Sequence, residues 1–470
     1  MRTFRLQRLP LIAMLSLVVG PITSTLRADE KSEASFHRDV VPILGRSCIA
    51  CHRPEKKKGK LDLTTYADFA KGGKDGPAFV AGEPEKSLVI QSVTGDEPEM
   101  PNKGERLSPA EVDVLTRWIK QGAKDDSPAP AQIVAEGAGV TGPQPPAEPP
   151  IYHVAPILGA LACSPDGNTL AVAGSHEVLL HHTDGSGVIA RLPSGSPRTT
   201  SLVFSPDGKL LAAAGGSPGE FGQIMVWSTA DWKPVKNYRV SGDTLFGLSF
   251  SPSTDRVAVG CADRSVRVIA LEDGKELDRF EQNTDWALCT AFSVDGTKVL
   301  SGSRDKSLRL FDLSTHRAFP QINEPTDPIY CLARHPAQDL VVTGCGGGLV
   351  RFYKTADPQK CTEEKRDPNR TREIDRQPGT VYAITYSADG KFLAVASAAE
   401  ARIYAEDGHR VATCTGQKGG VFAVAFSPDA KRLFTGGFDG QVRVFDAEKG
   451  QLVKEFLPVP IDGANQKSAN

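Results

Sequence analysis

The sequence has little net charge and few sulfur-containing side chains. Lys and Arg number 55 against 57 Asp and Glu, so no global field favours a nucleic-acid partner. Nine Cys residues, irregularly spaced, are too few for a disulfide scaffold. After the first thirty residues no apolar stretch is long enough to span a bilayer. We therefore expect no nucleic acid among the partners and no integral membrane span in the mature chain.

Length and turn-forming residues bound the fold. The chain has 470 residues, more than one ordinary domain uses. It contains 45 Gly and 34 Pro, which favour many turns. We expect two or more domains and an all-β majority.

The first 28 residues have the pattern of a secretory signal peptide. Arg2, Arg5 and Arg8 precede the mostly apolar stretch 9–22, and Ala28 offers a small residue for cleavage. No Cys near the cleavage region suggests a lipoprotein anchor, and no Arg-Arg pair suggests twin-arginine export. We predict a cleaved Sec-type signal and a periplasmic or otherwise exported protein. An uncleaved N-terminal anchor is the alternative.

Composition divides the rest of the chain. Residues 35–124 mix helical periodicity with Lys-rich and Gly-rich loops. Residues 125–150 are crowded with Pro, Ala and Gly and have no apolar periodicity, which is typical of a semi-rigid linker. Short strands and turns follow over residues 151–460, and a flexible tail over 461–470.

The motif that points to chemistry is Cys48-Ile49-Ala50-Cys51-His52. Two Cys with two residues between them, followed at once by His, form the attachment signature of a c-type haem. Each thiol adds to one vinyl group of the porphyrin, and the adjacent His ligates the iron. A zinc ribbon would need a second pair of ligands, and a thioredoxin-like motif would need a βαβ context. A structural disulfide between Cys48 and Cys51 remains the alternative.

A c-type haem needs a sixth ligand or an open site, and Met or His are the usual candidates. Met100 and Met225 are the only Met residues after the signal region. Met225 lies in the expected strand IMVW and reads as core. Met100 precedes Pro101, which stiffens its loop, and is therefore the predicted distal ligand. His37 is a further candidate, but on the first helix it is more often solvated.

Two amphipathic helices are expected to frame this site. The first, from residue 36, has Phe36, Val40, Ile43 and Leu44 on one face. The last begins with a capping box at residues 108–111, with Pro at the first helical position, and repeats apolar residues to Gly122.

Residues 36–123 resemble the cytochrome c domain found widely in planctomycetes. The matching pieces are VVPILGRSCIACH, KKKGKLDL, KGGKDGPAFVAGEPEKSLVI, EMPNKGERLS and VDVLTRWIKQGA. The resemblance implies one covalent haem c, with Cys48 and Cys51 as thioether positions. It implies His52 as proximal and Met100 as distal ligand of the haem iron. Asn102-Lys103 follow Met100-Pro101 where that family tends to have a second Pro.

A basic run follows the haem motif. Lys56, Lys57, Lys58 and Lys60 would form a collar that steers an acidic redox partner. A solvated loop explains the same run and is the more frequent outcome.

The C-terminal part repeats a strand-and-turn unit. The turns begin at intervals of 41, 46, 42, 42, 52 and 40 residues, close to the period of four-stranded propeller blades. They start at Ser164, Ser205, Ser251, Ser293, His335, Ser387 and Ser427. This repeat of strands and turns resembles the WD-repeat family. Asp263, Asp305 and Asp439 would lie in the turn between the second and third strands. The Gly-His half of that family's signature is missing. Seven units predict a closed seven-bladed ring.

The propeller shows no convergent catalytic set in its sequence. Its His residues are scattered, and His181 and His182 would point to opposite faces of a strand. Cys163, Cys261, Cys289, Cys331 and Cys345 fall in or beside strands and read as buried small hydrophobes. The charged stretch 354–379 reads as an elongated surface loop.

The sequence thus predicts a multidomain protein: a small all-α cytochrome c domain plus an all-β seven-bladed WD-type propeller. We expect an exported mono-haem electron carrier rather than an enzyme, with a redox partner protein and a protein partner docked on the propeller. One alternative is a haem-dependent oxidoreductase with a catalytic site or second cofactor in the propeller, as in haem-containing nitrite reductases. The other is a redox-sensing binding protein.

Overall fold

The computed structural model describes residues 33–49, 51–52, 58–101, 106–126, 142–146, 148–319, 326–355 and 367–462. The predicted signal peptide, Lys56, Lys57, Asn102, Lys103, most of the linker and nearly all of the tail lie outside these ranges. Within them, no helix is both long and apolar enough to span a bilayer.

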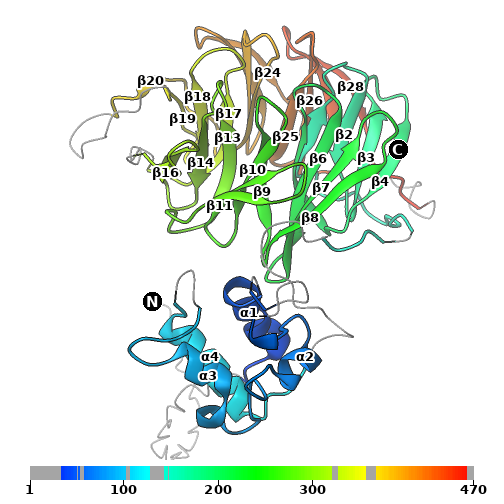
Figure 1. The fold of residues 1–470 in the computed structure, drawn as a ribbon. Coiled ribbons are helices and arrows are strands. Elements are labelled where there is room, and N and C mark those ends of the chain that lie inside the picture. The colour runs from blue at the N-terminus through cyan, green and yellow to red at the C-terminus, as the bar shows by residue number, and fades with distance from the viewer. Residues whose placement is uncertain are drawn as a thin grey trace, which may run out of the picture.

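Helices form the N-terminal part of the described chain, and Figure 1 shows them gathered in one body. They are η1 (Phe36–Val40), α1 (Val41–Ser47), η3 (Lys58–Lys60), α2 (Tyr66–Lys71), η4 (Pro84–Lys86), α3 (Leu88–Val93) and α4 (Pro109–Lys120). The described residues between 33 and 126 contain no strand; one isolated bridge joins Gly73 and Gly76.

The predicted first helix is two elements rather than one. Residues 36–40 form a π-type turn, in which the N–H of Val41 donates to the carbonyl of Phe36. The α-helix begins only at Val41, and Pro42, which has no N–H, occupies its first turn, where no intrahelical donor is needed. The two elements bury the predicted apolar face, so the prediction of which side chains are buried is confirmed. The prediction of one continuous α-helix from residue 36 is wrong.

Helix α4 begins with the predicted capping box. The Ser108 hydroxyl accepts from the N–H of Glu111, whose carboxylate accepts from the N–H of Ser108. Trp118 on this helix packs on Phe36, with ring centroids 5.1 Å apart, and on Phe79 at 4.9 Å. The first and last helical elements therefore meet through an aromatic core.

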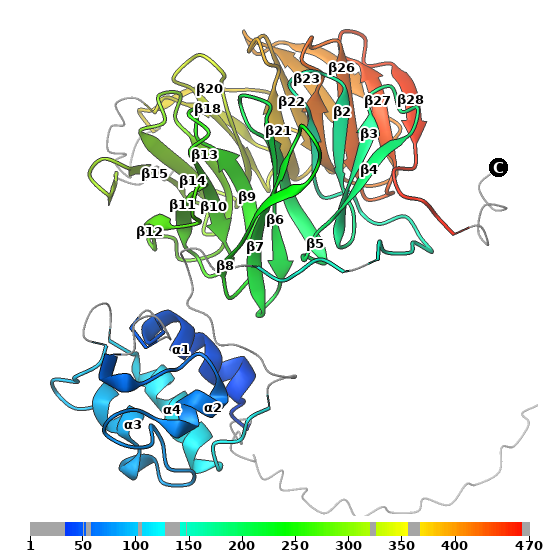
Figure 2. The ribbon, with the colours of Figure 1, turned by 45° about the vertical axis from the view of Figure 1, so that its right-hand side comes forward.

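Seven four-stranded antiparallel sheets form the rest of the molecule, each built from four consecutive strands in sequence order. Figure 1 and Figure 2 show them arranged as the blades of a ring. The predicted seven-bladed propeller is confirmed.

The strands of the first four blades are β1 (Leu161–Cys163), β2 (Thr169–Ala173), β3 (Glu177–His182), β4 (Val188–Pro193), β5 (Arg198–Phe204), β6 (Leu210–Ser217), β7 (Phe221–Ser228), β8 (Pro234–Ser241), β9 (Leu245–Phe250), β10 (Arg256–Cys261), β11 (Val266–Ala270), β12 (Glu276–Phe280), β13 (Ala287–Phe292), β14 (Lys298–Ser303), β15 (Leu308–Asp312) and β16 (Arg317–Ala318). Those of the last three are β17 (Ile329–Arg334), β18 (Val341–Cys345), β19 (Val350–Tyr353), β20 (Arg370–Glu373), β21 (Val381–Tyr386), β22 (Phe392–Ser397), β23 (Ala401–Ala405), β24 (Arg410–Cys414), β25 (Val421–Phe426), β26 (Arg432–Gly437), β27 (Val442–Asp446) and β28 (Leu452–Phe456).

The repeated turn joins the first two strands of a blade through one side-chain pair. In the second blade the Ser205 hydroxyl donates to Asp207 (2.6 Å) and accepts from the N–H of Leu210 (3.0 Å). Gly208 takes a positive φ of 71°, which glycine adopts without strain. The fifth blade has His335 in place of Ser. Its Nδ1 accepts instead from the N–H groups of Ala337 (3.1 Å) and Gln338 (2.9 Å).

A second turn, between the second and third strands, contains an Asp–Arg pair. Asp263 accepts from the hydroxyl of Ser265 and pairs with the fully buried Arg267. Asp305 with Arg309 and Asp439 with Arg443 repeat this arrangement. The position of these Asp residues was predicted from the repeat, and the Arg partner was not.

The ring closes by side-chain packing between its first and last blades. Leu158 and Leu161 pack in one buried cluster with Phe434 and Val442. The two ends of the propeller also meet, because Tyr152 forms a parallel bridge with Ile461. The closed ring leaves few exposed sheet edges.

The described end of the linker is attached to the second blade. The N–H of Gly142 donates to the carbonyl of Asn237 (3.1 Å). The side-chain amide of Gln223, itself buried, donates to the carbonyl of Pro143 (2.8 Å). The linker is therefore fixed to the propeller from residue 142 onward.

Part of the predicted surface loop 354–379 is a strand. β20 (Arg370–Glu373) is the fourth strand of the fifth blade and pairs with β19. Its outer position lets it consist of charged residues, which is why it lacks the apolar alternation of a strand. Arg351 and Arg370 both pair with Glu373. Residues 356–366 of the same stretch lie outside the described part.

We expect the propeller to lose stability in acid. Hydrogen bonds from Ser205 and from the Lys209 N–H lower the pKa of Asp207 below its ordinary value of 3.8, and Asp429 behaves likewise through Ser427. A lowered folded-state pKa contributes stability above the unfolded pKa, which is lost as pH falls through the folded value. Thermal unfolding followed by circular dichroism between about pH 5 and about pH 2 should show a falling Tm.

The matched variant is D207N/D429N, which keeps the hydrogen-bond acceptor and removes the titration. Its Tm should fall less steeply over the same pH range. Identical slopes for the variant and the native chain would show that these turns do not control acid stability.

Candidate cofactor site

The Cys48–His52 segment leaves the end of helix α1 as a further tight turn. The N–H of Cys48 donates to Leu44 (2.9 Å), and the N–H of Cys51 donates to the carbonyl of Cys48 (3.1 Å). Ile49 points the other way and is buried in the core. Cys48, Cys51 and His52 thereby face one cavity, and both thiols are free of any disulfide.

His52 is oriented by the backbone around it. Its ring is 9% exposed, and Nδ1 lies 3.0 Å from the carbonyl oxygen of Lys58. A carbonyl can only accept, so Nδ1 carries the proton and Nε2 keeps a free lone pair. Burial lowers the pKa of His52, which favours the neutral ring that can bind a metal.

Met100 lines the same cavity. Its N–H donates to the carbonyl of Ser92 (2.9 Å), which fixes the loop that follows helix α3 (Leu88–Val93). Pro101 lines the cavity beside it. The structure therefore brings together all four predicted site residues. Met225 is 3% exposed in β7, as the core interpretation requires, and the side chain of His37 lies outside the described part.

The cavity is large enough for a cofactor. Its volume is about 1450 Å³, which includes the space that the propeller residues Asp243, Asp263 and Glu281 line; ordinary ligand pockets have roughly 300–1,000 Å³. Apolar walls come from Leu61, Leu63 and Phe69. Two thiols, a neutral imidazole and a thioether around an apolar cavity are the donor set that a c-type haem uses, so the residues present fit that group.

Close backbone approach shapes one edge of the cavity. Gly72 has φ of 78°, and a Cβ at this position would lie 2.0 Å from the carbonyl oxygen of Gly76. Any larger residue at Gly72 would push apart the loop that lines the cavity at Gly73 and Gly76.

Charged residues surround the cavity, and few of them were predicted from the sequence to lie there. Lys58 of the predicted collar lines it, whereas Lys60 is exposed and is not among the lining residues. Arg46, Lys74 and Arg106 join Lys58. All three lie in the stretches that resemble the cytochrome c family, but nothing in those stretches indicated that their side chains line the cavity. The propeller adds three carboxylates to the lining, from Asp243, Asp263 and Glu281.

The remaining predictions concern the propeller. His181 is buried, with Nε2 2.9 Å from the carbonyl of Pro458, whereas His182 is exposed, so the two do point apart. In the described part of the chain, no three or more His, Cys, Asp or Glu side chains cluster as a metal site. Cys261, Cys289, Cys331 and Cys345 are buried as expected, and Cys163 is half-buried.

Comparison with known proteins gives matches to both parts of the chain. The family model "Planctomycete cytochrome C" matches residues 48–104, the stretch that carries all four predicted site residues. The model "WD domain, G-beta repeat" matches residues 232–269, 274–312 and 408–446. The chain joins a cytochrome c-like segment to a WD-repeat propeller.

Two curated proteins show the repeat relationship. "WD repeat-containing protein VIP3" of Arabidopsis thaliana is 26% identical over 139 residues, which cover 26% of this chain and 42% of that protein. "Actin-interacting protein 1" of Drosophila melanogaster is 31% identical over 123 residues, covering 25% of this chain and 18% of that protein. The chain thus spans less than half the length of either relative.

The haem-free chain should show a poorly reactive Cys48. Burial raises the pKa of this thiol from its ordinary value of 9.0 to about 11. Only the thiolate is nucleophilic, so at about pH 8 the reactive fraction falls about 100-fold. Alkylation followed by peptide mass spectrometry should label Cys48 slowly in the folded chain and fast after denaturation. Equal rates in both states would contradict the burial, and C51S isolates the signal of Cys48.

Proposed function

We propose that this chain is an exported mono-haem c-type cytochrome that carries electrons, with the propeller as a platform for a protein partner. The observation that supports it best is the convergence of Cys48, Cys51, His52 and Met100 on one cavity. In this proposal residues 35–124 form the all-α cytochrome c domain.

Each residue of this chain has a separable task. Cys48 and Cys51 would hold haem c through thioether bonds, and His52 and Met100 would be the axial ligands of its iron. When bound, the haem supplies one-electron redox chemistry. The Lys58 carbonyl holds the His52 ring in the tautomer that leaves Nε2 free. Leu61, Leu63 and Phe69 exclude water, which tunes the potential.

The basic residues around the cavity favour an acidic partner at the haem edge. Lys58, Lys74 and Arg106 line the cavity with no described carboxylate within ion-pair distance, apart from the weak 4.0 Å pair between Lys74 and the adjacent Asp75. Unneutralised cations at an entrance raise the encounter rate with negatively charged proteins. Relatives built from the same repeats, one of them named for its interaction with actin, support a docking role for the propeller.

Export would supply the compartment. Covalent haem attachment in bacteria takes place outside the cytoplasm, and the first 28 residues carry the pattern of a signal peptide. We therefore place the protein in the periplasm or an equivalent exported space.

The proposal predicts a visible spectrum that depends on two thiols. The chain exported together with the haem-attachment machinery should show a low-spin c-type spectrum that survives denaturation, because the haem is covalently held. The C48A/C51A variant should lose it. A colourless native chain made under these conditions would refute the proposal, and additional absorption bands would instead support an oxidoreductase with a second cofactor in the propeller.

A second prediction concerns the distal ligand. Thioether ligation raises the haem potential, so M100A should lower the potential and shift the reduced spectrum toward high spin. It should also let added imidazole bind to the iron. M225L, a change in the buried strand β7, is the matched control and should leave spectrum and potential unchanged. If M100A keeps the native spectrum, another group is the sixth ligand.

A further inference from the structure

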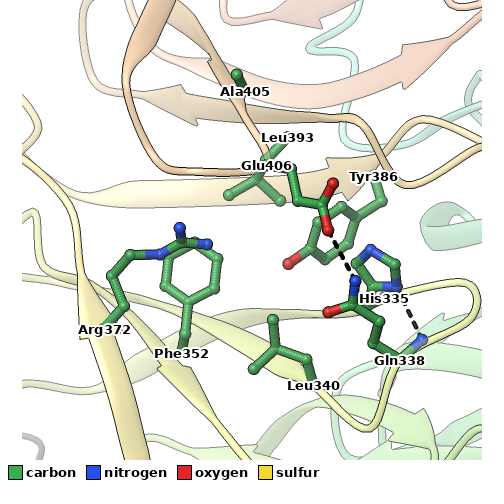
Figure 3. A pocket seen from close by; sticks show the side chains of 9 residues that line it. All are labelled: His335, Gln338, Leu340, Phe352, Arg372, Tyr386, Leu393, Ala405 and Glu406. Carbon is green, nitrogen blue, oxygen red and sulfur yellow. Dashed lines mark hydrogen bonds between the residues drawn. The ribbon is translucent and has the colours of Figure 1, made fainter.

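The propeller contains a cavity that the proposed electron transfer does not use. It lies between the fifth blade (β17–β20) and the sixth (β21–β24), has a volume of about 200 Å³ and is open on one side. Figure 3 shows its side chains. Polar groups come from His335, Arg372, Tyr386 and Glu406, and an apolar wall comes from Leu340 and Phe352.

His335 is the residue that departs from the repeat. Six of the seven blades have Ser at this turn position. Nδ1 of His335 accepts from two backbone N–H groups, so the proton of the neutral ring is on Nε2. The residue is 4% exposed, and Nε2 lies against the backbone of Gly390, in the turn between β21 and β22. Burial lowers the pKa of His335, which keeps the ring neutral. His335 therefore forms a fixed, neutral part of the cavity wall, and its ring contacts that of Tyr386 with centroids 5.0 Å apart.

Two polar groups that line the cavity have no hydrogen-bond partner among the described residues. The hydroxyl of Tyr386 and Nε of Arg372 are both buried, and neither has a hydrogen-bond partner in the described part of the chain. Figure 3 shows the Tyr386 hydroxyl pointing toward the Arg372 side chain. Burial raises the pKa of Tyr386, so its hydroxyl stays protonated and can donate. Arg372 stacks on Phe352, with its guanidinium carbon 4.3 Å from the ring centroid, which holds it in place.

Buried polar groups are normally paired, and two unpaired donors in one cavity, Arg372 and Tyr386, favour an acceptor between them. A carboxylate offers two oxygens with about four lone-pair sites and carries the charge that Arg372 needs. The cavity also contains a negative group. Glu406 accepts at Oε1 from the side-chain amide of Gln338 (2.7 Å) and stands at the exposed mouth. A ligand with a carboxylate alone would leave this charge uncompensated.

We propose that this cavity binds a small zwitterion, an α-amino acid with a short apolar side chain. Its carboxylate would accept from Arg372 and Tyr386, and its ammonium group would face Glu406. Leu340, Leu393 and Phe352 would contact the side chain. Since each water occupies roughly 30 Å³ of liquid, the cavity has room for about seven waters, a volume that suits alanine or valine but not a nucleotide.

The direct test is isothermal titration calorimetry on the full haem-loaded chain. Alanine and valine are the probes, and acetate, inorganic phosphate and isopropylamine test the two charges separately. We expect saturable binding of an amino acid and binding at least about tenfold weaker for acetate or isopropylamine. If phosphate or acetate bound as strongly as the amino acids, the claim that the ligand is a zwitterion would be wrong. No heat with any probe would overturn the site.

Variants separate the site from general effects on the fold. R372Q and Y386F should each weaken amino-acid binding at least about tenfold. Y386F removes an unpaired hydroxyl, so the Tm should not fall. The matched control is Y382F on the same strand, whose side chain does not line the cavity, and it should bind normally. The haem spectrum is recorded in parallel, so a failure of this proposal leaves the cytochrome proposal intact, and the reverse holds too.

Discussion

The fold of the larger part of the molecule depends on one contact, the packing of the first blade against the last. Leu158 and Leu161 are buried between Leu170 and Val172 of their own blade and Phe434 and Val442 of the last blade, so this cluster joins the two ends of the ring. Without this contact the ring would open, and two blades would expose apolar faces that six other junctions hide. Once it forms, each blade is held by two neighbours. The turns can then vary in sequence, as the replacement of Ser by His335 shows.

Features repeated or contiguous in sequence were predictable. Six of the seven turns share a Ser–Asp pair whose hydroxyl also binds the backbone of the same turn, so each of these turns is recognisable in the sequence without long-range information. The charged strand β20 was missed because an outer strand can be solvated on its exposed side and needs no alternating pattern. The π-type turn at residues 36–40 was missed because helical periodicity does not distinguish a wide turn from an α-helix over so few residues.

The candidate site shows the same division. Cys48, Cys51 and His52 are adjacent in sequence, so their meeting in space follows from one turn of chain. Met100 could be selected because only two Met residues were available after the signal region. Arg46, Lys74 and Arg106 come from separate loops and helix ends and reach the cavity only through the fold. The same holds for the unpaired donors of Arg372 and Tyr386, whose shared cavity exists only between two blades.

The attachment of the linker to Gln223 and Asn237 sets how far the two parts can separate. Because the chain is fixed again at Gly142, the length of chain between Asp126 and Gly142 limits the distance between these two residues. Fully extended, that length spans at most roughly 55 Å. A short tether of this kind keeps its two ends at an effective concentration on the order of millimolar. The encounter between the helical domain and a protein bound to the propeller would therefore be intramolecular. The rate of that encounter would not depend on the concentration of the complex.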